Sequence, residues 1–293
     1  MNKNKELISR VMGVKKEKIE YLTPLKKGMT NRSFKFAVDG KEYILRAPGE
    51  GTEKLINRKN EQKVYEKLKG KNISDKIIYI SGEDGYKITE YWETARVCDP
   101  LDKKDIKICM KKLRDFHELK LEVNHSFDMF KEIDFYESLW NDKPSMFGDY
   151  GETKEKIMKL KKLIDSMPKE YVLSHIDSVP DNFLIVDEHV FIIDWEYAGM
   201  QDPHVDIAMF AIYSLYDREQ TDFLIDSYFT QGCTHEIRMK IYSYMAIAGL
   251  LWSNWCEYKR MFGVEFGDYS LKQYDYAVEY YDIVDEDFIK VDK

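Results

Sequence analysis

Four polar residues whose types can move a proton or bind a metal ion lie close together in the sequence: His175, Asp177, Asn182 and Asp194. A carboxylate such as that of Asp177 can orient an attacking hydroxyl and accept its proton, and His175 belongs to the same catalytic segment. An amide and a second carboxylate, here those of Asn182 and Asp194, supply the hard oxygen ligands that Mg²⁺ prefers on a nucleotide phosphate. The spacing therefore indicates metal-assisted phosphoryl transfer.

The segment between these residues indicates how they would meet. Residues 183–186 and 190–193 are two apolar runs joined by residues 187–189, and this pattern predicts a β-hairpin. Because a hairpin reverses the chain, Asp194 would return to the side of Asn182. The Asp and Asn of the loop also enclose four residues, as in the catalytic loop of protein kinases. The alternative is an ordinary loop in which these side chains form turns.

The N-terminal region reads as three antiparallel strands. Residues 19–24, 34–38 and 41–46 are the predicted strands, and Asp39-Gly40 is a two-residue hairpin signal between the second and the third. The turn before the second strand is polar. In a kinase-like fold such a turn covers the ATP phosphates with backbone N–H groups; the alternative is a plain surface hairpin. The candidate nucleotide-binding residues in it are Gly28, Thr30 and Asn31.

Arg46 ends the third strand, where protein kinases carry the lysine that grips the phosphates. The planar donor fork of arginine can do the same work. Glu61 lies in a helix predicted over residues 57–68 and is the expected partner of Arg46. The alternative for Arg46 is a solvent-facing strand end.

The remaining chain changes from strands to helices. Residues 77–80 and 86–91 form a further strand pair, and residues 91–101 read as the hinge between two lobes. Glu90 and Trp92 mark this hinge, where adenine would bond to the backbone. Helices are predicted over residues 102–117, 153–167, 204–216, 217–228, 234–259 and 269–282.

Composition narrows the class of protein. The 293 residues suffice for two lobes, and a net charge of −8 argues against a nucleic-acid partner. The four cysteines have no paired spacing, so neither a disulfide framework nor a cysteine metal site is indicated. The first residues lack the apolar core of a signal peptide, and no long apolar run predicts membrane insertion. A cytoplasmic protein is expected.

The loop from His175 to Asn182, the run Asp194-Trp-Glu-Tyr-Ala-Gly and the later Asp206-Ile-Ala together resemble the choline/ethanolamine kinase and aminoglycoside phosphotransferase superfamily. Leu251-Trp-Ser-Asn-Trp is most similar to choline kinases, in particular the bacterial ones that supply phosphocholine for surface decoration. The resemblance implies an α+β, bilobal protein-kinase-like fold with a small antiparallel-sheet N-lobe and a mostly helical C-lobe. It implies ATP binding by residues 1–92, catalysis and choline binding by residues 93–293, and a need for Mg²⁺.

The resemblance also implies roles for single residues. Asp177 would be the catalytic base, Asn182 and Asp194 the magnesium ligands, and Asp206 a brace for the catalytic loop. As an alternative or additional role, Asp206 is a carboxylate favoured at a helix N-terminus. Tyr213 stands where relatives have an acidic residue that helps to hold the cation.

Choline as the acceptor requires a special pocket, because a quaternary ammonium cannot donate a hydrogen bond and is held by aromatic faces and negative charge. Trp252 and Trp255 are three residues apart in a predicted helix and so share a face. Their alternative role is packing in the core. Glu196 would add negative charge or organise the loop. The further candidates for this pocket are Tyr197, Tyr213 and Tyr269.

Other functions stay open from the sequence. Ethanolamine and aminoglycosides are alternative acceptors, although aminoglycosides call for a carboxylate-lined cleft rather than paired tryptophans. A catalytically inactive choline-binding sensor is a further alternative. The oligomeric state is not indicated.

Overall fold

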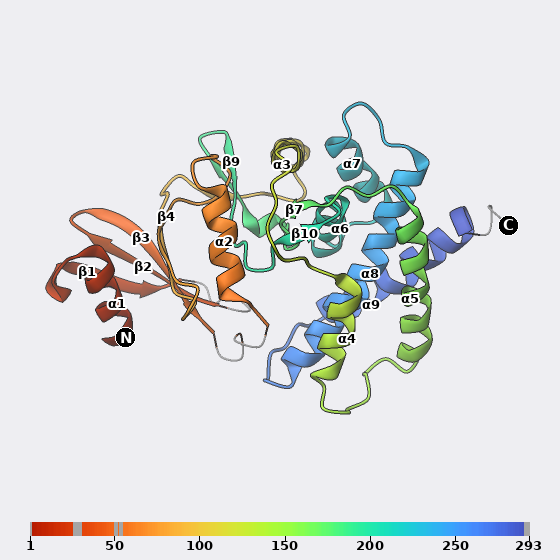
Figure 1. The fold of residues 1–293 in the computed structure, drawn as a ribbon, viewed down its shortest axis with the longest axis horizontal. Helices are drawn as coiled ribbons and strands as arrows, with labels where there is room; N and C mark the ends of the chain where they lie inside the picture. Colours follow the sequence, from red (N-terminus) through yellow and green to blue (C-terminus); the bar gives the residue numbers. More distant parts are fainter. Residues whose placement is uncertain (1, 26–30, 50–51, 53–54, 290–293) are drawn as a thin grey trace. The chain divides into compact units, whose positions relative to one another are not determined.

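The first third of the chain is built around an antiparallel sheet with the strand order β1-β2-β3-β5-β4 (Figure 1). The computed structural model describes residues 2–25, 31–49, 52 and 55–289. The strands of this sheet are β1 (Ile19–Pro24), β2 (Asn31–Val38), β3 (Lys41–Pro48), β4 (Ile77–Ile80) and β5 (Lys87–Glu90). The strands predicted in this region are confirmed, and β2 and β3 each extend a few residues beyond the prediction.

The tight turn between β2 and β3 fixes the register of the sheet. Asp39 and Gly40 both have positive φ, 49° and 72°, as a two-residue hairpin turn requires. Val38 therefore pairs with Lys41, and the ladder continues to Asn31 opposite Pro48. This ladder carries Arg46 in β3.

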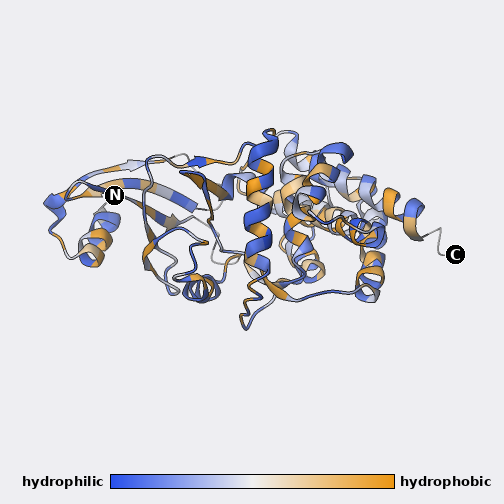
Figure 2. Cartoon of the chain, turned by 90° about the horizontal axis from the view of Figure 1, so that it is seen from above, coloured by the Kyte–Doolittle hydropathy of each residue, from blue (hydrophilic) through white to orange (hydrophobic). Residues whose placement is uncertain are grey.

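A helix that the sequence analysis did not predict, α1 (Asn2–Met12), packs on this sheet. Hydrophilic and hydrophobic residues are mixed along it (Figure 2). Its Leu7 and Ile8 join the apolar core formed by the strands. The buried residues contributed by the strands and the β4–β5 region are Ile19, Phe36, Val38, Leu45, Ala47, Tyr86 and Ile88.

The predicted hairpin after the catalytic loop is present as β8 (Phe183–Val186) and β9 (His189–Ile192). Its turn is shorter than predicted, because Asp187 and Glu188 alone form it, with φ values of 46° and 67°, and His189 already pairs with Val186. A short strand, β6 (Arg96–Val97), lies on the other side of β8. The helix α2 (Arg58–Leu68) is capped by the side chain of Asn57.

The residues group into two compact units. The sheet unit comprises residues 1–97 and 182–197, so the β8–β9 hairpin groups with the N-terminal residues. The helical unit comprises residues 98–181 and 198–293. An antiparallel-sheet part and a mostly helical part agree with the predicted α+β class. The functional lobes expected from the sequence, 1–92 and 93–293, remain a prediction.

The helical unit also carries the short strands β7 (Val172–Ser174) and β10 (Gly199–Gln201), which pair with each other. At its centre α8 approaches α9 closely: a Cβ at Gly249 would lie 2.5 Å from the carbonyl oxygen of Gln273. The six helices predicted for this unit are confirmed, with shifted ends, and a seventh helix, α4, was not predicted. The helices are α3 (Lys103–His117), α4 (Met129–Ser138), α5 (Tyr150–Ser166), α6 (His204–Tyr213), α7 (Arg218–Tyr228), α8 (His235–Arg260) and α9 (Tyr269–Val284).

Single helical turns complete the chain at 16–18, 180–182 and 285–289. Within the ranges that the structure describes, no helix combines the length and the apolar character needed to cross a bilayer.

Candidate active site

The β8–β9 hairpin brings the two predicted magnesium ligands to the same end of a ladder. Asn182 closes the helical turn that precedes β8, and its carbonyl oxygen accepts a hydrogen bond of 2.9 Å from the N–H of Ile193. Asp194 follows directly, with a φ of 63°. Aspartate is one of the few residue types that adopt this left-handed conformation readily. The chain reversal thus brings the amide residue Asn182 and the carboxylate residue Asp194 to the same end of the hairpin, as predicted.

The predicted pair of Arg46 and Glu61 is present in the sheet unit. The two guanidinium nitrogens of Arg46 donate to the two carboxylate oxygens of Glu61 at 2.5 and 2.7 Å. Arg46 also donates to Oδ1 of Asp194 at 3.0 Å. Arg46 is only 5% exposed, so the alternative of a solvent-facing strand end is wrong.

These contacts fix the charge states of the pair. Burial opposes a charge on either group, but their mutual attraction outweighs it. The carboxylates of Glu61 and Asp194 hold the pKa of Arg46 well above its usual range. Although burial raises the pKa of Glu61, the charge and hydrogen bonds of Arg46 lower it to about 2. Both groups are therefore ionised near neutral pH.

A second arginine, which was not predicted from the sequence, also belongs to this site. Arg58, in the first turn of α2, donates to Oε2 of Glu61 at 3.0 Å and to Oε2 of Glu196 at 2.8 Å. Its other nitrogen donates to Oδ1 of Asn31 at 2.9 Å, and Asn31 in turn donates to Glu196 at 2.8 Å. The spacing of Arg58 and Glu61, three residues apart in a predicted helix, was the available signal.

Asn31 and Glu196 thus bind each other. For Glu196, these bonds agree with the alternative in which it organises the loop after β9. Burial and the neighbouring charge of Asp194 raise its pKa, although Arg46 and Arg58 oppose the shift.

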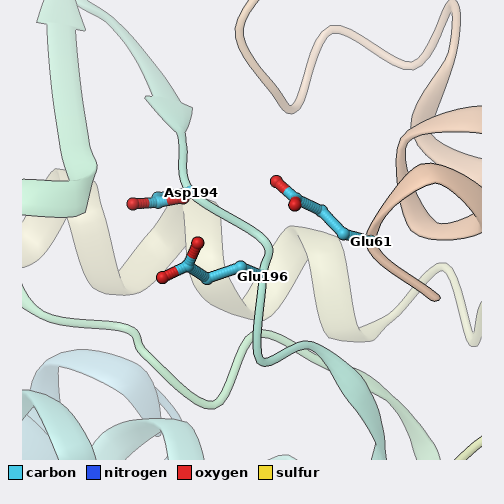
Figure 3. Close-up of side chains that lie close together, drawn as sticks. All are labelled: Glu61, Asp194 and Glu196. Carbon is cyan, nitrogen blue, oxygen red and sulfur yellow. The ribbon is translucent and has the colours of Figure 1, made fainter. Parts of the chain in front are cut away.

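Three carboxylates converge in this unit, and Figure 3 shows Glu61 coming from α2 while Asp194 and Glu196 come from the segment after β9. One oxygen from each lies within 4.8 Å of the others. Glu61 and Glu196 are buried and engaged by the two arginines, whereas the Asp194 side chain is 30% exposed. A carboxylate that retains access to solvent, next to an amide residue, fits the oxygen donors that Mg²⁺ prefers.

Replacing Arg46 by methionine is expected to lower the free energy of unfolding by about 3–5 kcal/mol, because it leaves the buried carboxylate of Glu61 with less compensating charge. Urea denaturation measures the loss. Lys59→Met is the matched control, because Lys59 lies on the same helix as Glu61 but pairs with Glu83 at the surface, where both side chains are more than half exposed. A loss no larger than that of the control would contradict the importance of the buried pair.

The catalytic loop lies in the helical unit. Asp177 is half-buried, three residues after the end of β7. His175 is fully buried, and its backbone N–H donates to Oδ2 of Asp206 at 2.8 Å. The N–H of Ile176 donates to Oδ1 of the same carboxylate at 2.6 Å. Asp206 therefore contacts the two residues that precede Asp177, and the burial of His175 favours a role in shaping the loop.

The predicted choline-binding aromatics of the helical unit form one cluster. Trp252 and Trp255 meet edge to face with ring centroids 5.8 Å apart, and Tyr213 meets Tyr269 at 5.9 Å. Phe266 joins the two pairs, at 5.4 Å from Trp255 and 6.5 Å from Tyr269. Glu196 and Tyr197, the other two candidates, belong to the sheet unit.

The charge of Asp177 acts on this aromatic cluster. The pKa of Tyr213 is raised by burial and then by the carboxylates of Asp181 and Asp177. The pKa of Tyr269 is raised by burial first, with Cys256, Tyr213 and Asp177 contributing. The expected catalytic carboxylate and the predicted cation-binding aromatics therefore belong to the same unit.

Two further nucleotide candidates, Glu90 and Trp92, lie within the described residues of the sheet unit. Glu90 ends β5, and its N–H donates to the carbonyl oxygen of Lys76 at 3.0 Å. Trp92 packs on Phe191 of β9 with ring centroids 4.6 Å apart. Gly28 and Thr30 lie outside the described residues.

Comparison with known proteins identifies the family of the chain. The family model of choline/ethanolamine kinases matches residues 22–248. The protein LicA of Haemophilus influenzae strain KW20 Rd is 29% identical over 267 residues, which cover 85% of this chain and 97% of that protein.

Among solved structures, choline kinase LicA from Streptococcus pneumoniae is 30% identical, with a TM-score of 0.85 over 96% of this chain and 98% of that one. A structure of LicA in complex with AMP is 29% identical, with a TM-score of 0.83 over 97% and 98% of the two chains. This likeness confirms the predicted protein-kinase-like fold. The chain belongs to the choline/ethanolamine kinase family.

Proposed function

We propose that the chain is an ATP-dependent choline kinase, which transfers the γ-phosphate of ATP to the hydroxyl of choline and gives phosphocholine. Membership of the family and the likeness to choline kinase LicA support the reaction. The observation that carries the choice of acceptor is the aromatic cluster of the helical unit, in which Trp252 meets Trp255 and Tyr213 meets Tyr269.

The residues divide the work by their chemistry. Asp177 orients the choline hydroxyl and accepts its proton, because it is the half-buried carboxylate of the loop that Asp206 binds. Arg46, held by Glu61, supplies positive charge for the phosphates. Asn182 and Asp194 would hold Mg²⁺, which neutralises the charge that develops on the transferred phosphoryl group. The reaction belongs in the cytoplasm, where ATP is supplied, and the free cysteines are compatible with that compartment.

Trp252 supplies the first test of choline binding. Replacing it by alanine or leucine is expected to raise the KM for choline by roughly 2- to 30-fold, the equivalent of one cation–π contact, and to change the KM for ATP little. Trp140→Leu is the matched control, since Trp140 is a buried tryptophan of the same unit that packs on Tyr150 outside the cluster. Equal effects on both substrates would point instead to the packing role of Trp252.

The proposed function itself is tested by measuring ATP consumption with magnesium and with choline, ethanolamine or kanamycin at equal concentration. Strong stimulation by choline supports the proposal. Preference for ethanolamine would retain the kinase but change the acceptor, because a primary ammonium also fits an aromatic site. Stimulation by kanamycin alone would refute the assignment of the aromatic cluster, and no stimulation by any acceptor would favour the inactive sensor.

A further inference from the structure

A histidine that the sequence analysis did not assign lies behind the catalytic loop. His117, at the end of α3, is buried, and its Nε2 lies 2.9 Å from Oδ2 of Asp206. Its Nδ1 lies 2.9 Å from the hydroxyl of Tyr228 in α7. An ionised carboxylate only accepts hydrogen bonds, so Nε2 carries a proton; in the neutral imidazole, Nδ1 then accepts from the tyrosine hydroxyl. Each partner of the ring therefore has a defined role.

Both oxygens of the carboxylate that His117 binds, that of Asp206, accept hydrogen bonds. Oδ1 of Asp206 accepts from the N–H of Ile176, while Oδ2 accepts from the N–H of His175 and from His117. Asp206 is fully buried, so rotation of its carboxylate would break bonds to the loop. The bond from His117 opposes this rotation.

The loop needs such support because it is strained. Ile176 has a φ of 70°, a conformation that is unfavourable for a β-branched residue. Backbone strain of this kind persists only where the surroundings impose it, and it gathers at functional sites. Here it occurs at the residue immediately before Asp177. The bond from Ile176 to Asp206, at 2.6 Å, holds the strained residue in place.

We infer that His117 is a positioning residue for phosphoryl transfer. Its hydrogen bond fixes the orientation of the Asp206 carboxylate, and this carboxylate in turn holds the strained residue Ile176 and so positions Asp177. The inference rests on the proposed role of Asp177 as the catalytic base. His117 touches no reacting atom in this account. Its effect therefore falls on kcat more than on the KM of either substrate.

The surroundings of His117 fix the ring from its other side. Arg114, one turn earlier in α3, donates to the carbonyl oxygen of Tyr228 at 2.6 Å. The same residue whose hydroxyl binds Nδ1 is thus held through its backbone as well. Tyr228 is 6% exposed, so its bond to the histidine is shielded from water.

Two substitutions separate the two bonds of the ring. The amide nitrogen of glutamine can take the place of Nε2, so His117→Gln retains a donor to Asp206 and loses the acceptor for Tyr228. Asparagine is shorter, so His117→Asn can reach Tyr228 but not Asp206. We expect His117→Asn to lower kcat by roughly 10- to 100-fold, as misplacement of a catalytic group does, with both KM values within about threefold of wild type. His117→Gln should restore most of kcat.

Thr221→Val is the control for a general loss of stability. It removes a buried hydroxyl of α7 that lies 3.3 Å from the hydroxyl of Tyr280, away from the loop. It should lower the melting temperature without lowering kcat. The inference is overturned if His117→Asn has the wild-type kcat, if His117→Gln is as impaired as His117→Asn, or if Thr221→Val loses kcat to the same extent at an equal loss of stability.

If His117→Asn does not fold, His117→Leu carries the test, because it also removes the donor to Asp206 and leaves an apolar side chain in the buried site. A lowered kcat with unchanged KM values supports the inference, and an unchanged kcat overturns it. Asp177→Ala is measured alongside: if that variant retained turnover, the proposed function itself would fail, whereas a normal His117→Asn beside an inactive Asp177→Ala would remove only the role of His117.

Discussion

Replacing Asp177 by alanine is expected to lower kcat with choline by about 10²–10⁴-fold while the protein stays folded, because the reaction loses the group that orients the hydroxyl and accepts its proton. Asp206 binds the loop through the backbone N–H groups of His175 and Ile176, and the substitution retains both groups. The loop should therefore keep its shape. Steady-state kinetics and circular dichroism measure the two effects.

The control for this experiment is Glu170→Gln, which neutralises an exposed carboxylate that pairs with Lys120 shortly before β7. Its kcat should equal that of the wild type. Near-normal turnover by Asp177→Ala would remove the assigned base. A parallel loss of secondary structure would show that the loss of activity comes from unfolding rather than from the chemistry.

The second large effect is expected for Asp194→Asn. Asparagine adopts the same left-handed backbone conformation and retains an oxygen that can accept from Arg46, so the change removes mainly the negative charge. We expect kcat to fall by about 10²–10³-fold, and the dependence of the rate on magnesium to shift to higher concentrations, since a neutral amide binds the cation more weakly.

The hairpin offers its own matched control. Asp187→Asn makes the same substitution at the turn between β8 and β9, where φ is also positive, at 46°. It should leave both kcat and the magnesium dependence unchanged. If Asp194→Asn showed the wild-type dependence on magnesium, Asp194 would not be a metal ligand, and the charge of this cluster would serve the fold alone.

The parts of the fold that could be predicted are those with local signals. The turn at Asp39-Gly40 forms because both residues accept positive φ. The first residues of α2 and α3 follow from the N-capping side chains of Asn57 and Asp102. The helix α4 was missed, although its buried Met129, Ile133 and Tyr136 follow a helical spacing.

The residues of the candidate site likewise divide into those with a signal in the sequence and those without one. Arg46 and Glu61 were found because their order along the chain matches that of a strand cation and a helix carboxylate. His117 was missed because nothing near it in sequence indicates a partner; its contact to Asp206 joins two helices and depends on tertiary packing. The strained backbone conformation of Ile176 cannot be read from residue type alone.

The grouping of residues 182–197 with the N-terminal residues means that the chain passes between its two compact units three times, after residues 97, 181 and 197. Neither unit is a continuous piece of polypeptide. A fragment that ends at residue 97 would lack β8, the strand that pairs with β6, and the remaining fragment would carry that hairpin without its partner strand. The sheet unit is therefore expected to wait for the helical unit during synthesis: a nascent chain cannot complete the sheet unit until the whole first segment of the helical unit, residues 98–181, has been made.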